Sequence, residues 1–575
     1  MAGPTTPFRR SDAIDALRTE SFDLTVVGGG ITGAGVALDA ASRGLRVALI
    51  DRGDFASGTS SKSSKLIHGG LRYLQQGEVA LVYEALAERQ RLLRNAPHLV
   101  SLTPFLIPMF GKGGVLPAKI ARILGGAMWA YDLTGGLRIG KVHKRVDRDE
   151  ALEYFPTLPA ENLASAYLYY DCAADDARLV LTVLRTAAHD HRAVVANHLP
   201  AVGLRQGPDG GVNGVEVEAG TAEASDRFVI DTSAVVNAAG VWSDDVREFD
   251  EGSPPDSIRP AKGIHITIPH SLVGNSIAAV IPVPGDRRSV FVVRKGEFAY
   301  IGTTDTDYDG PVDDPQCTPD DIDYLLRAIN GSCVNEIRAD HIVGTWAGLR
   351  PLVKSADSGR TADLSRRHKV SVSDHGLVTV TGGKLTTYRK MAVDTVDAVL
   401  ANVLDDEVTG HVSKSRTKKL RLRGASGYKS VATAAQRATA VSSDSAEHLA
   451  GRYGGEARAV MALIDDDPSL AEPIVDGLPY LRAEAVFAAR FEMARSVDDV
   501  LSRRTRARLF GRDDSSRAAA LVADLIAPEL GWSAAEAEAS AAAYRALVDH
   551  ERDAAGLSEV YLADVSSSGV AVASI

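Results

Sequence analysis

The chain has 575 residues, of which 45% are hydrophobic and 24% charged, and its formal net charge is −11. This composition excludes a mainly disordered chain, a collagen and a coiled-coil rod, and the length favours more than one domain. The acidic balance disfavours a nucleic-acid-binding protein, which is usually basic.

No run of eighteen apolar residues is present, and the first 21 residues lack the apolar region of a secretory signal. The three cysteines, Cys172, Cys317 and Cys333, make neither a disulfide framework nor a CxxC metal site. We therefore expect a protein of a reducing compartment, the cytoplasm, without a spanning helix.

A βαβ unit follows the polar lead-in of residues 1–21. A β-branched run predicts a strand over 22–27, an Ala- and Val-rich stretch predicts a helix over 31–43, and RVALI predicts a strand over 46–50. The other expected elements are helices over 78–99 and 176–190, a strand over 193–195, a β-rich region over 212–304, a hairpin over 369–381 and a helix over 391–404. Beyond about residue 405 the composition favours a helical domain that ends near 560, and 561–575 is expected to be a tail.

The turn of the βαβ unit carries the pattern Gly28-x-Gly30-x-x-Gly33, and Asp51 ends the second strand. Gly28 permits the tight turn, Gly30 allows the backbone to approach a pyrophosphate, and Gly33 lets the helix pack closely on the sheet. The free N–H groups of the helix N-terminus attract phosphate, and Asp51 can accept hydrogen bonds from a ribose diol. The pattern indicates a dinucleotide cofactor, with FAD, NAD and NADP still open at this point.

The stretch SGTSSKSSKLIHGGLRYL over 57–74 closely resembles the flavin-proximal signature of FAD-dependent glycerol-3-phosphate dehydrogenases. Four further stretches, over 169–181, 235–244, 346–353 and 381–389, and a helical one over 478–506 are similar to the same family. The resemblance implies an α/β fold: a Rossmann-like FAD-binding domain with an interleaved β-rich substrate domain, plus a C-terminal helical domain. The implied FAD-binding segments are 22–100, 165–255 and 345–400; the implied substrate segments are 101–164 and 256–344; the oxidoreductase region is 22–400 and the helical domain 405–560.

This family implies oxidation of sn-glycerol 3-phosphate to dihydroxyacetone phosphate, with hydride transfer from C2 to flavin N5 and electrons passed to a quinone. The nearest alternative is a glycerol-3-phosphate oxidase that reduces oxygen, followed by another flavin amine or amino-acid oxidase. A flavin-binding or nucleotide-sensing protein without turnover is the alternative from another class.

The substrate needs cations for its phosphate and a group that accepts the C2-hydroxyl proton. His68 is the first candidate for the proton acceptor, and Lys384 or Arg350 are the alternatives. The expected substrate-binding residues are Arg72, Tyr73, Arg350, Arg366 and Lys384.

By the same resemblance, FAD contacts are expected at the fingerprint residues Gly28, Gly30, Gly33 and Asp51. Ser60, Ser64 and Lys65 are expected at the pyrophosphate or the flavin, and Val202 at the adenine. The last expected contacts are Ala239, Gly240, Gly382 and Gly383.

Residues 105–145 carry seven Lys and Arg residues against Asp132 alone, among apolar and aromatic side chains. We interpret them as a peripheral contact with anionic lipid at the inner face of the cell membrane, or equally as a surface that steers anionic substrate. A homodimer is left open. His189 and His191 lack a third ligand at metal-site spacing, so no metal is expected, and Arg503–Arg506 are expected to pair with Glu492, Asp498 and Asp499.

Overall fold

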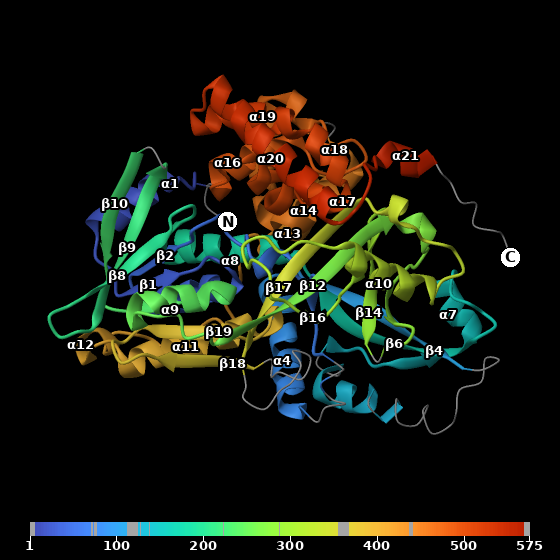
Figure 1. Cartoon of the computed structure of the whole chain (residues 1–575), viewed down its shortest axis with the longest axis horizontal. Helices are drawn as coiled ribbons and strands as arrows, with labels where there is room; N and C mark the ends of the chain where they lie inside the picture. Colours follow the sequence, from blue (N-terminus) through green and yellow to red (C-terminus); the bar gives the residue numbers. More distant parts are fainter. Residues whose placement is uncertain are drawn as a thin grey trace.

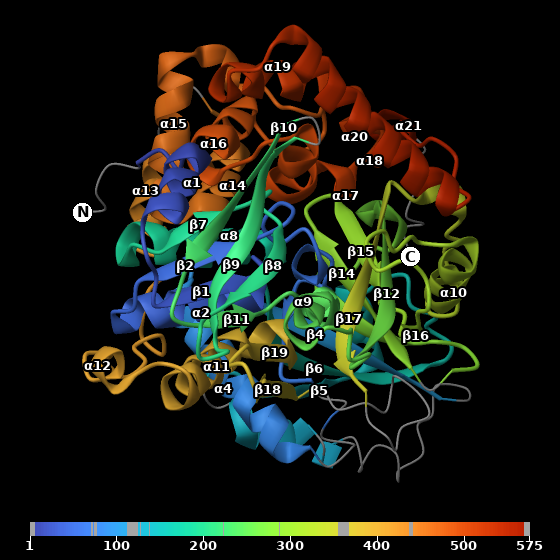
Figure 2. The same cartoon turned by 60° about the vertical axis from the view of Figure 1, so that its left-hand side comes forward.

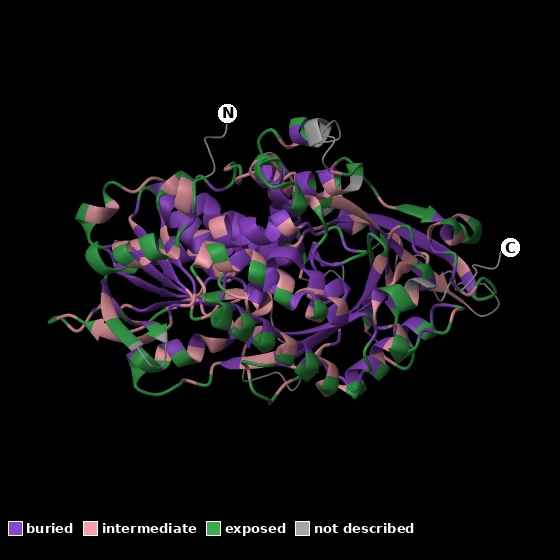
Figure 3. Cartoon of the chain, turned by 90° about the horizontal axis from the view of Figure 1, so that it is seen from above, coloured by how far each residue is buried: buried purple, intermediate pink, exposed green. Residues whose placement is uncertain are grey.

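The computed structural model describes residues 6–70, 73, 78–111, 125–126, 128–136, 139–221, 224–286, 288–354, 367–435 and 441–567. Two sheets lie side by side, and a group of helices formed by the C-terminal residues covers them from one side (Figure 1). Buried residues run through both sheets and the helices between them, as Figure 3 shows.

The first sheet has six strands in the order β18-β19-β11-β1-β2-β7. All neighbouring pairs are parallel except β18–β19, which form an antiparallel hairpin. The strands are β1 (Leu24–Val27), β2 (Val47–Ile50), β7 (Val194–Ala196), β11 (Val235–Asn237), β18 (His368–Val372) and β19 (Val378–Gly382). β1 and β2 are buried at every residue, as strands covered on both faces must be.

Three helices pack together on this sheet: α2 (Ile31–Arg43), α8 (Asp176–His191) and α11 (Tyr388–Asn402). α2 lies between the other two, and a Cβ added at Gly35 would come within 2.7 Å of the Tyr388 ring. A three-stranded sheet of β8 (Ala201–Gln206), β9 (Val212–Thr221) and β10 (Ala224–Asp231), together with α9 (Ser243–Glu251), lies beside the sheet (Figure 2). The β-rich region expected over 212–304 therefore also contains a helix.

The second sheet has ten strands, and it combines residues from three parts of the chain. Its strands are β3 (Leu66–Ile67), β4 (Ser101–Phe110), β5 (Lys144–Val146), β6 (Leu163–Ala173), β12 (Ile258–Pro269), β13 (Ala278–Pro282), β14 (Ser289–Lys295), β15 (Phe298–Gly302), β16 (Thr306–Asp307) and β17 (Gly344–Val353). β3, which leads into His68, pairs with β6, and β17, which carries Arg350, pairs with β12. The pairing brings these distant segments to one sheet.

The C-terminal residues form helices, as expected. They are α13 (Tyr428–Ala435), α14 (Ser443–Tyr453), α15 (Ala457–Asp466), α16 (Arg482–Glu492), α17 (Ala507–Phe510), α18 (Arg512–Arg517), α19 (Ala519–Leu530), α20 (Ala534–Ala554) and α21 (Leu562–Ser567), with a π-helix over Asp499–Thr505 between α16 and α17. The fold class predicted from the sequence is confirmed, and the exact domain boundaries stay a prediction.

The expected helices and strands of the βαβ unit are confirmed to within two residues. The expectation for residues 105–145 needs correction, because Phe105 and Leu106 belong to β4 and are fully buried. Residues 112–124 lie outside the described residues, and so do Arg72 and Arg366.

Candidate active site

The turn between β1 and α2 has no room for side chains at its glycines. Gly28 has a φ of +113°, and a Cβ there would lie 2.6 Å from the carbonyl oxygen of Ala238. A Cβ at Gly33 would lie 1.9 Å from the carbonyl oxygen of Gly28. α2 begins after Gly30; the N–H of its first residue, Ile31, donates to Oγ of Ser60 at 2.9 Å, and Ile31 and Thr32 line a cavity.

Asp51 lies at the end of β2 and lines the same cavity. Its carboxylate accepts hydrogen bonds from the backbone N–H of Gly29, at 2.6 Å, and of Gly53, at 2.8 Å. Burial outweighs these bonds and raises the pKa of Asp51 to about 6. The carboxylate is therefore fixed in orientation beside the glycine turn.

The cavity has a volume of about 760 Å³ and extends from the β1–α2 turn to the end of β19. It is large and formed by seven separate segments, as suits a dinucleotide site. Its lining includes eight of the twelve residues expected to contact FAD: Gly28, Gly30, Asp51, Ser60, Ala239, Gly240, Gly382 and Gly383. Gly33 lies behind the turn, where it allows the close packing described above.

Besides Gly33, two expected contacts lie outside the lining of this cavity and of its neighbour. The Nζ of Lys65 is 3.3 Å from the carboxylate of Asp176 and 4.6 Å from the centroid of the Trp346 ring. This buried carboxylate holds Lys65 away from the cavity. Val202 follows the lining residues Leu199–Ala201 on β8 but is not among them.

A smaller cavity of about 210 Å³ adjoins the first and shares Ser60, Gly383 and Lys384 with it. Its lining brings together His68, Tyr73, Arg350 and Lys384, which come from separate segments of the chain. These are all the expected catalytic and substrate-binding residues within the described part of the chain. Ser64 also lines this cavity, not the larger one.

Arg350 reaches the smaller cavity from β17. Its Nη1 lies 3.0 Å from Oδ1 of Asp305, and its Nη2 donates to Oγ1 of Thr303 and to the carbonyl of Thr304. The side chain is 21% exposed, so the guanidinium is oriented yet accessible from the cavity. A guanidinium held in this way is suited to bidentate recognition of an anion.

His68 and Lys384 both line the smaller cavity. The N–H of His68 donates to Oγ1 of Thr386, at 3.2 Å, and its ring makes an edge contact with Phe291. Lys384 precedes the short 3-10 helix Leu385–Thr387, and its Nζ lies over the ring of Tyr73. Thr386 thus ties the His68 segment to the segment of Lys384.

A buried network supports the backbone next to His68. Asp171 on β6 accepts hydrogen bonds from the hydroxyl of Tyr131, at 2.7 Å, and from the N–H of Gly69, and it forms an ion pair with Arg89. Burial raises the pKa of Asp171 despite the nearby Arg89. The network fixes the position at which the chain passes from β3 into the cavity.

The sequence analysis missed His265, which lines the smaller cavity from β12. Its Nε2 lies 2.8 Å from Oγ of Ser64, and its ring stacks on Trp346 with centroids 4.6 Å apart. Burial lowers the pKa of His265 well below its usual range, so the ring is neutral. One signal was available: a histidine between Ile264 and Ile266 interrupts an otherwise apolar run.

The C-terminal helices reach the loops of both cavities through arginines. Arg504 donates two hydrogen bonds, of 2.6 and 2.8 Å, to Asp54, and Arg506 pairs with Asp176, which accepts from Ser63. The predicted pairing of Arg503 with Asp498 and Asp499 is confirmed, at 2.7 Å to each. Asp54, His198 and Asp499 lie close enough together to hold a metal ion. The carboxylates of Asp54 and Asp499 already form ion pairs with arginines.

Comparisons with known proteins agree with this arrangement. The family model described as FAD dependent oxidoreductase matches residues 23–389, and the one described as C-terminal domain of alpha-glycerophosphate oxidase matches residues 415–537. The chain is 39% identical over 550 residues to glycerol-3-phosphate dehydrogenase 2 of Mycobacterium tuberculosis. The aligned residues make up 95% of this chain and 91% of the relative. It is 35% identical over 546 residues to the human mitochondrial glycerol-3-phosphate dehydrogenase, with coverage of 92% and 73%.

Among solved structures, the glycerol-3-phosphate dehydrogenase from Bacillus halodurans, complexed with FAD, superposes with a TM-score of 0.75 and 29% identity, and covers 95% of this chain and 97% of its own. The L-α-glycerophosphate oxidase from Mycoplasma pneumoniae matches with a TM-score of 0.51 and 15% identity over 69% of this chain and 99% of its own. The second likeness is one of fold alone.

Proposed function

Because the chain belongs to the family of FAD-dependent glycerol-3-phosphate dehydrogenases, we propose that it oxidises sn-glycerol 3-phosphate to dihydroxyacetone phosphate and passes the electrons to a quinone. The observation that carries the proposal is the junction of the two cavities. The larger one has the glycine turn, the helix N-terminus and the oriented Asp51 of a dinucleotide site, and the smaller one gathers His68, Arg350 and Lys384.

The larger cavity fits FAD, the family's cofactor. The backbone at Gly28 and Gly30 and the N-terminus of α2 would hold the pyrophosphate, and Asp51 would accept from the ribose hydroxyls. Gly382 and Gly383, at the junction with the smaller cavity, would lie near the flavin. When bound, FAD supplies the acceptor for the hydride that leaves C2 of the substrate.

The side chains of the smaller cavity have separate roles in the proposed reaction, namely substrate binding and proton acceptance. Arg350 and Lys384 bind and orient the anionic substrate, as a guanidinium and an ammonium do for phosphate. His68 accepts the proton of the C2 hydroxyl. His265 is neutral and adds no further charge near the cations. Arg72 and Arg366 stay predicted phosphate ligands.

An exposed apolar patch supports the proposal of a membrane contact. It consists of Val79, Tyr83, Trp129, Leu133 and Val142, and Leu133 is 70% and Trp129 59% exposed. α4 (Val79–Asn95) contacts the π-helix Asp132–Gly136, and the Trp129 ring lies 5.0 Å from that of His143, next to Val142. Such a cluster of large apolar side chains on a surface is typical of an interaction site. Within the described residues no helix is long and apolar enough to cross a membrane.

Anaerobic mixing of the purified flavoprotein with glycerol 3-phosphate tests the activity. We expect bleaching of the flavin absorbance, and no bleaching with glycine or proline of equal concentration. Addition of a quinone analogue should restore the oxidised spectrum. In air without quinone, stoichiometric hydrogen peroxide would instead identify the oxidase alternative, and an unchanged spectrum with glycerol 3-phosphate would refute the proposed substrate.

A further inference from the structure

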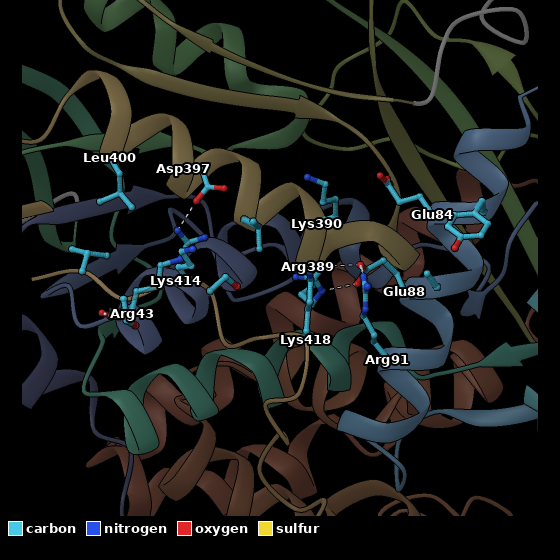
Figure 4. A pocket seen from close by; sticks show the side chains of 16 residues that line it. Arg43, Glu84, Glu88, Arg91, Arg389, Lys390, Asp397, Leu400, Lys414 and Lys418 are labelled. Atoms are coloured by element: carbon cyan, nitrogen blue, oxygen red, sulfur yellow. Dashed lines mark hydrogen bonds and ion pairs between the residues drawn. The ribbon is translucent and has the colours of Figure 1, made fainter. Parts of the chain in front are cut away.

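A third cavity, of about 770 Å³, lies between α2, α4, α11 and the segment 412–418, and it shares no lining residue with the two cavities of the active site. Figure 4 shows its lining side chains, which come from these separate elements. Six cations line it, Arg43, Arg91, Arg389, Lys390, Lys414 and Lys418, against the three acids Glu84, Glu88 and Asp397. The excess of cations stands out in a chain whose net charge is −11.

A buried ion-pair cluster lines one part of this cavity, and two carboxylates outside the lining compensate further cations, because Asp39 pairs with Arg43 and Asp394 with Lys390. Arg389 donates to both oxygens of Glu88, at 2.7 and 2.6 Å, and Arg91 pairs with the same carboxylate. One carboxylate therefore serves two guanidinium groups. Arg389 and Glu88 are 5% and 1% exposed, so solvent screens the remaining charge weakly.

At the opposite end of the cavity, two carboxylates compensate the charge of a buried arginine. Arg43 is buried between Asp39, at 2.6 Å, and Asp397, at 2.5 Å, and its Nε has no hydrogen-bond partner among the described residues. An unused buried donor is costly unless a ligand or water satisfies it. A ligand with acceptor oxygens would meet this need.

Two lysines stand at the rim, one near each end of the cavity. Lys414 lies beside Arg43, and Lys418 lies beside Arg389 and Arg91 (Figure 4). Both are exposed, and neither forms an ion pair within the described part of the chain. Within the described residues these two ammonium groups, unlike the guanidinium groups of the lining, are engaged by no carboxylate, and an ammonium binds phosphate as a point charge.

We propose that this cavity binds a phosphate group carried by a larger molecule, at a site separate from the dehydrogenase site. Its volume exceeds that of a phosphate ion, so the bound molecule brings additional atoms. Tyr83 of the apolar patch is also one of the lining residues. The phosphate is therefore either that of a lipid headgroup beside the patch or that of a free phosphorylated compound.

The test compares two double variants of the full-length holoprotein. Lys414→Glu with Lys418→Glu reverses the charge of the rim, and Arg416→Glu with Lys419→Glu makes the same charge change at two exposed neighbours that do not line the cavity. In one arm, each protein is sedimented with vesicles of phosphatidylglycerol and phosphatidylcholine in equal parts. In the other, the rise in unfolding temperature caused by inorganic phosphate is measured. None of the four residues lies in the active-site lining, so dye-linked oxidation of glycerol 3-phosphate should stay at the parent's rate in both.

A lipid headgroup is indicated if the rim variant alone loses vesicle binding, by about 25-fold, the product of roughly fivefold for each lysine. A free phosphorylated compound is indicated if the rim variant alone loses the phosphate-induced rise. The proposal is overturned if the two double variants behave alike in both arms. Where the rim variant loses FAD through misfolding, Lys414→Gln with Lys418→Gln replaces it. Because dye-linked oxidation is measured separately, failure of this proposal does not affect the proposed activity.

Discussion

The Nζ of Lys384 lies 3.7 Å from the centroid of the Tyr73 ring, so the residue that precedes the 3-10 helix Leu385–Thr387 lies over a residue between β3 and α4. A cation over an aromatic face is attracted by the ring quadrupole, and the contact fixes the ammonium at the edge of the smaller cavity. The two segments that contribute His68 and Lys384 are thereby joined at the point where the substrate is proposed to bind.

Replacing Lys384 with Met should lower kcat/KM for glycerol 3-phosphate by about ten- to a hundredfold, because a charge-assisted hydrogen bond worth about 1.5–3 kcal/mol is lost. Steady-state dye-linked kinetics measure it. Lys369→Met, at an exposed position on β18, is the control and should leave the kinetics unchanged. Equal kinetics of the two variants would remove Lys384 from the substrate site.

Arg350→Ala should also damage turnover severely while FAD stays bound, because Arg350 lines the smaller cavity and not the larger one. Arg350→Lys should restore little, since an ammonium cannot reproduce the fork held by Asp305, Thr303 and Thr304. FAD absorbance and kcat/KM are measured on the same preparations. A wild-type kcat/KM for Arg350→Ala would contradict the assignment.

Gly30→Val should yield mainly apoprotein. A Cβ at Gly30 already comes within 3.1 Å of Oγ of Ser60, and the branched methyls would occupy the position expected for the pyrophosphate. Gly451→Ala, on α14 with no atom within 4 Å of the added Cβ, is the matched control and should keep its FAD. The flavin released on denaturation is quantified. Normal FAD content in Gly30→Val would refute the fingerprint assignment.

The stability of the protein should depend on the protonation of His265. Its pKa is lowered well below the usual value by burial, so the unfolded chain takes up a proton near pH 6.5 that the folded chain does not. The contribution to stability is complete above pH 6.5 and falls by about 1.4 kcal/mol per pH unit below it. The thermal midpoint of the parent should therefore fall more steeply from pH 7 to 5 than that of His265→Gln, and parallel profiles would contradict this.

Trp129→Glu with Leu133→Glu should release the protein from anionic vesicles and slow quinone-linked turnover, while dye-linked turnover is spared. The two side chains are the most exposed members of the apolar patch, and charged groups there oppose insertion into the lipid interface. Val334→Glu, at a 64% exposed position distant in sequence from the patch, is the control for the effect of adding one negative charge to the surface. Loss of dye-linked activity would indicate damage to the active site instead.

The sequence by itself determined the βαβ unit, the glycine turn, Asp51 and the helical C-terminal part. Each depends on contacts between residues close in the chain: the periodicity of apolar residues over 24–50 and the need for glycine at 28 and 33 can be read locally. Motif resemblance added His68, Arg350 and Lys384, which the structure brings to one cavity.

Only the tertiary structure decided the partners of the charged side chains. Lys65 faces Asp176 instead of the cofactor cavity, His265 enters the substrate cavity from β12, and Phe105 is buried in β4 although its neighbours suggested a surface. Each outcome depends on strands and helices that are distant in sequence and meet through sheet pairing. A carboxylate supplied from α8 or an arginine from the π-helix has no local signature, because ion pairs act through distance in space and not along the chain.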